Sequence, residues 1–291
     1  MMNAEVEILL STYNGEKYLA EQLDSILAQT YGNFKITIRD DHSTDSTLSI
    51  IQSYIDKYPA KISLYKDPIW KVKNMGSTFS FGRLMQQATG QYLMLCDQDD
   101  VWMEDKITIT LTRFKSIEAE NPNTPILVFS DMVEVDENLK TVNTSFIQNQ
   151  KLLPQVKDEA IKVLAMNVVA GCTTMFNKQC VDIVLPFPSK KVIHDHWMAI
   201  NIAQYGIVEY INRATLYYRQ HSNNVVGANE VGLKYFISKI GKPMKQLGLY
   251  NDLIYNLTFK INVFKFIYYK TALNIKRLFK SNPRATVKVK S

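Results

Sequence analysis

The segment VEILLSTYNG at residues 6–15 decides the fold, because it joins a short apolar run to a polar loop. Val6–Leu10 has the length and composition of a buried strand. The apolar residues that follow the loop recur at helical spacing and are Tyr18, Leu19, Leu23, Ile26 and Leu27. The segment therefore predicts a strand, a loop and a helix, which is the first unit of an α/β fold.

The same unit recurs through the next hundred residues. Further strands are predicted at Ile36–Arg39, Ile62–Tyr65, Tyr92–Cys96 and Ile126–Ser130, with helices near Thr78–Ala88 and Asp105–Ala119. Strands separated by helices imply right-handed crossovers, so we expect a mostly parallel, buried central sheet flanked by helices. Thr173–Asn177 and Thr215–Arg219 resemble additional strands, and His196–Tyr205 resembles a helix.

Composition places the chain among globular proteins, since 46% of its 291 residues are hydrophobic and 21% are charged. It contains no run of 18 apolar residues, and Val6–Leu10 is too short for a signal peptide. The three cysteines, Cys96, Cys172 and Cys180, form no C-x-x-C pair. We therefore expect a cytoplasmic protein in a reduced compartment.

The charge is distributed unevenly. Residues 232–291 hold 13 Lys and Arg against one acid, a balance of +12, so residues 1–231 carry −6. Because aromatic residues alternate with these lysines, the segment favours an anionic membrane surface over nucleic acid. We divide the chain into a catalytic domain at 1–228 and a basic, aromatic-rich helical tail at 229–291. Packing of the tail on the catalytic domain, or a contact in a homodimer, is the alternative.

Polar residues follow each predicted strand. In a parallel α/β sheet, ligands bind beyond the carboxyl ends of the strands, so these residues are expected to gather at one edge. The groups are Ser11 with Tyr13, Asp40 with Asp41, Asp97-Gln98-Asp99-Asp100, His194-Asp195-His196 and Arg219-Gln220-His221.

The acidic group after Cys96 predicts a metal site. Three carboxylates within four residues would repel one another unless a cation lay among them. Mg²⁺ or Mn²⁺ held by one or two carboxylates usually takes its other ligands from phosphate and water, which indicates a phosphate-bearing substrate. The alternative is that Asp99 or Asp100 only caps the following helix.

The motifs together resemble those of a known family. Ser11-Thr12-Tyr13-Asn14, Gln29-Thr30, Asp40-Asp41-His42-Ser43-Thr44-Asp45 and Asp97-Gln98-Asp99 resemble the family 2 glycosyltransferases of GT-A fold. His194-Asp195-His196-Trp197 and Tyr218-Arg219-Gln220-His221-Ser222-Asn223-Asn224 resemble the rhamnosyltransferase-like branch. The resemblance covers residues 5–227 and leaves out the tail.

The resemblance implies an inverting transfer of a sugar from a nucleoside diphosphate donor to an acceptor hydroxyl. By position, Tyr13 would stack on a pyrimidine, with Ser11 assisting. Asp41 would accept the N3–H of uracil or thymine, and Asp97 would contact the ribose or the sugar.

The same resemblance assigns the metal and the phosphate contacts. Asp99 would bind Mg²⁺ or Mn²⁺ on the diphosphate, and His221 would complete that site. Arg219 would make a bidentate contact to phosphate.

The general base that the resemblance implies is Asp195. If the segment is extended, His194 and His196 point to alternate sides, so that one orients Asp195, and Trp197 offers a face for a sugar ring. The alternative for His194-Asp195-His196 is the start of a helix with incidental histidines.

The resemblance also implies a pathway. Rhamnose from a dTDP-sugar is the leading donor, with a UDP-sugar as the other choice. The acceptor would be a lipid-linked saccharide of bacterial surface polysaccharide, used on the inner face of the membrane. A metal-dependent nucleotidyltransferase or phosphohydrolase is the competing class, although the chain has no G-x-G and only four histidines.

Overall fold

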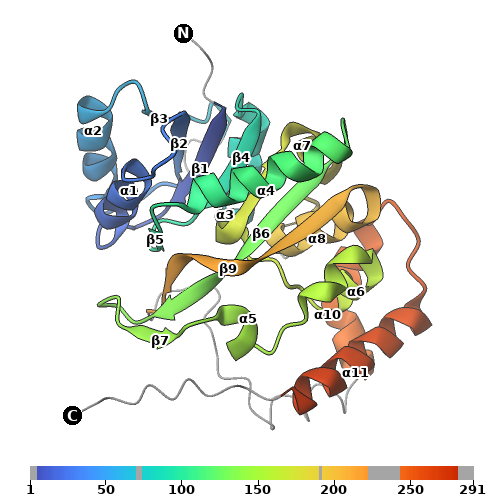
Figure 1. Ribbon diagram of the computed structural model, residues 1–291. Helices are drawn as coiled ribbons and strands as arrows, with labels where there is room; N and C mark the ends of the chain where they lie inside the picture. The colour runs from blue at the N-terminus through green and yellow to red at the C-terminus, as the bar shows by residue number, and fades with distance from the viewer. Residues whose placement is uncertain (1–4, 70–73, 190–191, 222–242, 281–291) are drawn as a thin grey trace, which may run out of the picture.

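The computed structural model of the protein describes residues 5–69, 74–189, 192–221 and 243–280, with the backbone alone at 243–249 (Figure 1). The division proposed at residue 228 lies outside the described residues.

The first half of the chain forms a parallel sheet, as predicted. Its strands are β1 (Val6–Thr12), β2 (Phe34–Asp40), β3 (Ile62–Leu64) and β4 (Tyr92–Cys96), paired in the order β3-β2-β1-β4. The helices that connect them are α1 (Leu19–Leu27), α2 (Thr47–Lys57) and α3 (Ser77–Gln87). All four strands therefore end at the same edge.

The second half makes the sheet mixed rather than mostly parallel. Its strands are β5 (Val101–Trp102), β6 (Ile126–Val135), β7 (Thr141–Asn143), β8 (Thr174–Asn177) and β9 (Ile207–Arg219). β8 runs antiparallel to β4 and to β6, β5 is antiparallel to β9, and β6 pairs with β9 in parallel and with β7 antiparallel. β8 is antiparallel because the chain enters it from the edge where β6 ends, without a crossover back to the other edge.

Apolar side chains of the sheet pack into two layers of helices. Leu9 of β1 belongs to the layer under α3, α7 (Lys178–Val184) and α8 (His194–Tyr205). Ile8 and Leu10 face the opposite layer, which contains α1, α2 and α4 (Lys106–Glu120). The alternation of these side chains follows from the period of two along a strand. The remaining short helices are α5 (Phe146–Asn149), η1 (Pro154–Asp158), α6 (Ala160–Ala165) and η2 (Gly171–Thr173).

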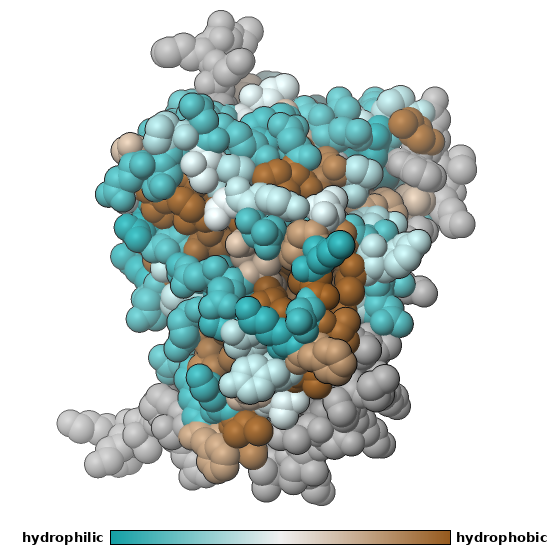
Figure 2. Space-filling view, turned by 90° about the vertical axis from the view of Figure 1, so that its right-hand side faces the viewer, coloured by the Kyte–Doolittle hydropathy of each residue, from teal (hydrophilic) through white to brown (hydrophobic). Residues whose placement is uncertain are grey.

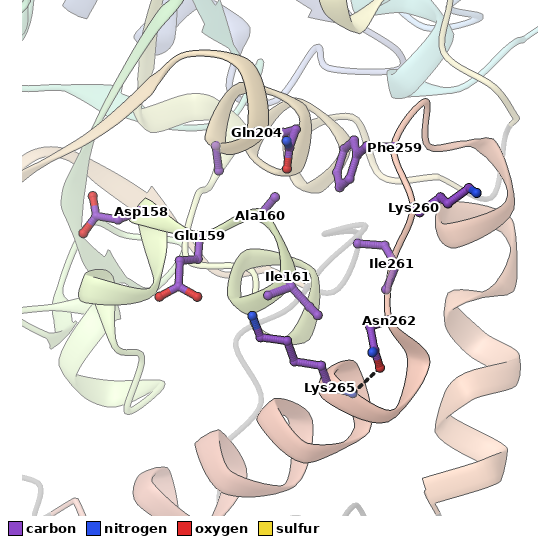
Figure 3. Close-up of a pocket in the computed structure, with 11 residues that line it drawn as sticks. Asp158, Glu159, Ala160, Ile161, Gln204, Phe259, Lys260, Ile261, Asn262 and Lys265 are labelled. Atoms are coloured by element: carbon purple, nitrogen blue, oxygen red, sulfur yellow. Dashed lines mark hydrogen bonds between the residues drawn. The ribbon is translucent and has the colours of Figure 1, made fainter.

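The described part of the tail forms α10 (Pro243–Asn256) and α11 (Val263–Phe279), which pack beside α6 at the lower right of Figure 1. The connection between them closes a pocket of about 390 Å³ against η1, α6 and the end of α8 (Figure 3). None of the predicted site residues lines this pocket. Within the described residues, no helix has the length and apolarity needed to cross a bilayer.

Candidate active site

Hydrogen bonds join the loops after β1 and β4. The backbone N–H of Tyr13 donates to Oε1 of Gln98 at 2.8 Å, and Nε2 of Gln98 donates to the carbonyl of Tyr13 at 3.0 Å. A Cβ at Gly15 would lie 2.3 Å from the same Oε1, so a side chain there would displace the Gln98 amide. Tyr13 is 46% exposed, which leaves its ring available for stacking. Gln98 belongs to the acidic group that was expected at this edge, but no role was predicted for it.

The Asp41 carboxylate is buried and already holds three donors. Nη1 of Arg39 lies 2.8 Å from its Oδ1, and the backbone N–H groups of Met75 and Gly76 each donate to Oδ2 at 2.8 Å. Gly76 has a φ of 83°, a conformation that favours glycine. Because a carboxylate offers about four acceptor positions, one place is left for a further donor.

A short network connects Asp41 to the end of β1. The Arg39 guanidinium also donates to Oγ of Ser80 at 3.0 Å, and Oγ of Ser11 donates to the same atom at 2.7 Å. Ser11 and Asp41 are thus linked through Arg39 and Ser80 of α3. The neighbouring Asp40 is used differently, since it accepts from the backbone N–H of Ser43 at 2.8 Å.

The acidic residues after β4 repel one another. Burial, together with the charges of Asp99 and Asp195, raises the pKa of Asp97 to about 7. Burial, Asp99 and Asp97 raise the pKa of Asp100 well above its ordinary value. Within the described chain, Oδ2 of Asp100 has no hydrogen-bond partner. The buried Lys106 ammonium offsets this repulsion only in part, so the centre favours a further positive charge.

These residues fit a divalent cation. Nε2 of His221 lies 2.9 Å from Oδ2 of Asp99, so the structure brings the predicted pair together. Beside them, ligand atoms of Asp97, Asp100 and Cys172 all lie within 4.8 Å of one another. Mg²⁺ and Mn²⁺ prefer oxygen ligands, and burial raises the pKa of the Cys172 thiol, so the carboxylates are the better donors. No pattern in the sequence marked Cys172 as a neighbour of these acids.

Asp195 lies in the first turn of α8 and faces this acidic centre. Its Oδ1 accepts from Nδ2 of Asn167 at 3.2 Å, and its Oδ2 accepts from the backbone N–H of Gly171 at 3.3 Å. Burial raises the pKa of Asp195 to about 6, although these donors and the backbone N–H of His196 act against the rise. A Cβ at Gly171 would lie 2.7 Å from Nε2 of His194, so glycine permits α8 to approach. No pattern in the sequence pointed to Asn167 or Gly171.

The contacts predicted for His196 and Trp197 are wrong. The segment is helical rather than extended, so these side chains turn away from Asp195. Trp197 is 5% exposed and its Nε1 donates to the carbonyl of Val184 at 2.9 Å. Nε2 of His196 lies 3.0 Å from the carbonyl oxygen of Val163, and burial lowers the pKa of His196 to about 4. Both residues support α8 from the core.

The bidentate phosphate contact predicted for Arg219 is also wrong, because its guanidinium is buried among protein groups. Nε donates to the carbonyl of Asp99 at 2.9 Å, Nη1 donates to the carbonyl of Glu137 at 2.6 Å, and Nη2 pairs with Glu21. Its Cζ lies 4.5 Å from the centroid of the Tyr18 ring. Arg219 therefore fixes the loop that carries Asp99.

Comparison with known proteins identifies the family of the chain. The model of the family "Glycosyl transferase family 2" matches residues 7–180. An uncharacterized glycosyltransferase of Nostoc sp. is 25% identical over 227 residues, which are 76% of this chain and 66% of that protein. A dTDP-rhamnosyl transferase of Shigella flexneri is 29% identical over 233 residues, 76% of this chain and 74% of that protein. The chain thus spans about two thirds to three quarters of these two relatives.

Solved structures share the fold. The S. aureus protein TarS (residues 1–349), in complex with UDP-GlcNAc, has a TM-score of 0.57 at 18% identity, with 98% of this chain and 76% of that chain covered. A mannosyltransferase from Pyrobaculum calidifontis, in complex with GDP-Man and Mn²⁺, has a TM-score of 0.59 at 16% identity, with 94% and 72% covered. Because the family model spans more than half of the chain and the fold agrees, this protein belongs to glycosyl transferase family 2 and is a glycosyltransferase of GT-A fold.

Proposed function

We propose that the protein moves a sugar, with inversion, from a dTDP- or UDP-sugar to a hydroxyl group of a saccharide acceptor. One observation carries the proposal. Asp97, Asp99 and Asp195 come from the end of β4 and the start of α8, yet they lie close enough for the charges of Asp99 and Asp195 to raise the pKa of Asp97. Perturbed carboxylates from separate elements are typical of an active site.

The nucleotide would bind beside β1 and β2. The exposed Tyr13 ring offers a stacking face for a pyrimidine, and the remaining acceptor position of Asp41 suits the N3–H of uracil or thymine. Ser11 and Asp97 flank the path from the base to the diphosphate. Since Arg39 and two backbone N–H groups already hold Asp41, the pocket would need little reorganisation.

Asp99 and His221 would hold a Mg²⁺ or Mn²⁺ ion, with Asp97 or Asp100 beside it. The charge of such an ion offsets the negative charge that gathers on the leaving diphosphate. Arg219 would keep the Asp99 loop in place rather than contact the phosphate.

Asp195 would act as the general base. The acceptor oxygen attacks the anomeric carbon of the donor sugar on the face opposite the diphosphate, and the bond from that carbon to the phosphate oxygen breaks. The acceptor proton passes to Asp195, which later releases it to water. A pKa of about 6 keeps Asp195 ionised at neutral pH and makes it a stronger base than an ordinary aspartate.

The identities of the transferred sugar and of the acceptor are more specific parts of the proposal. Rhamnose is supported by the 29% identity to the Shigella flexneri dTDP-rhamnosyl transferase. For the acceptor we propose a lipid-linked saccharide of bacterial surface polysaccharide, used by a peripheral enzyme on the cytoplasmic face of the membrane.

The products of a nucleotide-sugar panel test the proposal. The protein is incubated with dTDP-rhamnose, UDP-glucose, UDP-GlcNAc and GDP-mannose, each with Mg²⁺ or Mn²⁺. We expect nucleoside diphosphate release from a pyrimidine donor and not from GDP-mannose. Pyrophosphate exchange would identify a nucleotidyltransferase instead, and release of inorganic phosphate would identify a phosphohydrolase.

A further inference from the structure

The outward face of α11 carries an exposed aromatic stripe. It consists of Phe264, Tyr268, Ile275 and Phe279, and the two phenylalanines are 86% and 80% exposed. At 3.6 residues per turn, these four positions fall within an arc of about 60°. Large apolar side chains aligned in this way cost free energy in water, so the stripe indicates a surface that is covered in use.

The opposite face of α11 fixes this orientation. Phe266 and Leu273 are buried against the catalytic domain. Nζ of Lys270 donates to the carbonyl of Ala165 at 2.6 Å, and Nη2 of Arg277 donates to the carbonyl of Gln150 at 2.7 Å. The stripe is therefore not the face that packs on the domain.

The charged residues of α11 itself are all positive, while Asp158 and Glu159 line the pocket next to Lys265. Lys265 and Lys276 are exposed on the same side of the helix, Lys260 is exposed just before it, and residues 263–279 contain no acid. A second copy docked through this stripe would bring two sets of lysines together. The charge pattern therefore favours an anionic partner over a homodimer.

We propose that this outward face of α11 docks on the surface of an anionic lipid bilayer. Aromatic side chains partition to the boundary between headgroups and acyl chains, while the lysines beside them attract acidic headgroups. The stripe lies on the outward surface of a helix and not in a groove. Such a surface suits contact with a planar bilayer better than binding of a peptide. Figure 2 looks onto the side of the molecule that carries α6, α10 and α11 and shows apolar patches among hydrophilic residues.

Docking deepens the proposed function, because it would hold the enzyme at the surface where a lipid-linked acceptor is found. The docking inference rests on the proposed function only in assuming that the acceptor is lipid-linked. The catalytic carboxylates lie outside α11, so docking and sugar transfer can be measured separately.

Cosedimentation of the full chain with vesicles tests the docking surface. We expect binding to vesicles of phosphatidylglycerol and phosphatidylcholine and little binding to phosphatidylcholine alone. The double variant Lys265→Gln/Lys276→Gln is expected to bind about 25-fold more weakly, at about fivefold for each lysine. Phe264→Ser/Phe279→Ser is expected to abolish stable binding, because both exposed anchors are lost.

Matched changes on α2 serve as controls. Leu48 and Lys57 are also exposed, and Leu48→Ser/Lys57→Gln should bind vesicles like the parent. All variants should release nucleoside diphosphate at the parental rate with a soluble acceptor. Unchanged vesicle binding by both α11 variants would overturn the proposal, as would a parental dimer that these variants dissolve. Vesicle binding without sugar transfer would instead contradict the proposed function and leave the docking surface standing.

Discussion

The carboxylates at the ends of β2 and β4 lie in opposite electrostatic surroundings. Asp41, just after β2, is held by Arg39 and by two backbone N–H groups. Asp97, just after β4, faces Asp99 and Asp195 and has a raised pKa. One carboxylate is satisfied by the protein itself, and the other is not.

This difference separates binding from chemistry. A satisfied carboxylate such as Asp41 keeps its position whether or not a nucleotide is present, so it can select a base without reorganisation. The acids near Asp97 oppose one another until a positive charge arrives. The fold therefore holds mutually repelling carboxylates close together at the place where a cation and a glycosyl diphosphate would bind. Binding of the cation would reduce this repulsion.

The largest effect is expected for Asp195→Asn. The amide cannot accept the acceptor proton, so kcat for sugar transfer should fall by about 10²–10⁴-fold. The proposal places the nucleoside diphosphate against Tyr13, Asp41 and Asp99, so its Kd by calorimetry should stay at the parental value. A parental transfer rate would show that Asp195 is not the base.

Removal of the proposed metal ligand comes next. Asp99→Ala should lower Mn²⁺-supported transfer by about 10²–10³-fold, the usual range for a lost electrostatic contact to developing charge. A chelator should inactivate the parent and change the variant little further. Asp56→Ala on α2 removes an exposed acid and should behave like the parent. Equal metal dependence in parent and Asp99→Ala would contradict the assignment.

For Asp41, whose carboxylate is held by Arg39, we predict an effect on stability. Arg39→Met leaves Asp41 buried without its cation, so urea denaturation should show a loss of about 3–5 kcal/mol in the free energy of unfolding. Loss of one exposed partner, as in Lys17→Met beside Glu137, should cost less than about 1 kcal/mol. Equal losses for the two variants would contradict the difference between the buried and the exposed ion pair.

We expect the inactive variant Asp195→Asn to have a higher free energy of unfolding than the parent, because it removes one of the repelling carboxylates. The pKa of Asp195 is raised to about 6, so its contribution to stability is full below the unfolded pKa and is lost as the pH rises through 6. Asp195→Asn should therefore stabilise the metal-free protein at about pH 8 by at most about 3 kcal/mol. Urea denaturation at about pH 4 should show almost no difference, and a variant less stable than the parent at pH 8 would contradict this.

The smallest effect concerns the orientation of the base. The pH profile of kcat/KM should show an ascending limb near pH 6, the pKa of Asp195. Asn167 donates to this carboxylate, so Asn167→Ala should move the limb upward by about half a unit to one unit. A lower kcat with an unmoved limb would mean that Asn167 affects only packing.

The sequence predicted the parallel half of the fold, and it singled out acids whose roles stay predictions. β4 and α3 follow directly from an apolar run and a helical period, and Asp99, Asp195 and His221 stood out as polar residues beyond predicted elements. Such signals are local, because each depends on a few neighbouring residues.

What the sequence could not supply was the direction of side chains and the partners from distant loops. His196 and Trp197 point into the core because α8 presents that face to β6 and α6, which the segment alone does not reveal. Arg219 is occupied by carbonyls of Asp99 and Glu137, and these residues meet it only in the folded chain. Asn167 reaches Asp195 in the same way.

A crystal structure of the protein with dTDP and Mn²⁺, recorded at the manganese absorption edge, tests the central claim most directly. We expect one anomalous peak within about 2.0–2.3 Å of a carboxylate oxygen of Asp99, touching the diphosphate, with thymine against Tyr13 and Asp41. Asp195 should face the same cleft. A manganese ion bound away from Asp97, Asp99 and Asp100, or a nucleotide bound elsewhere, would contradict the account.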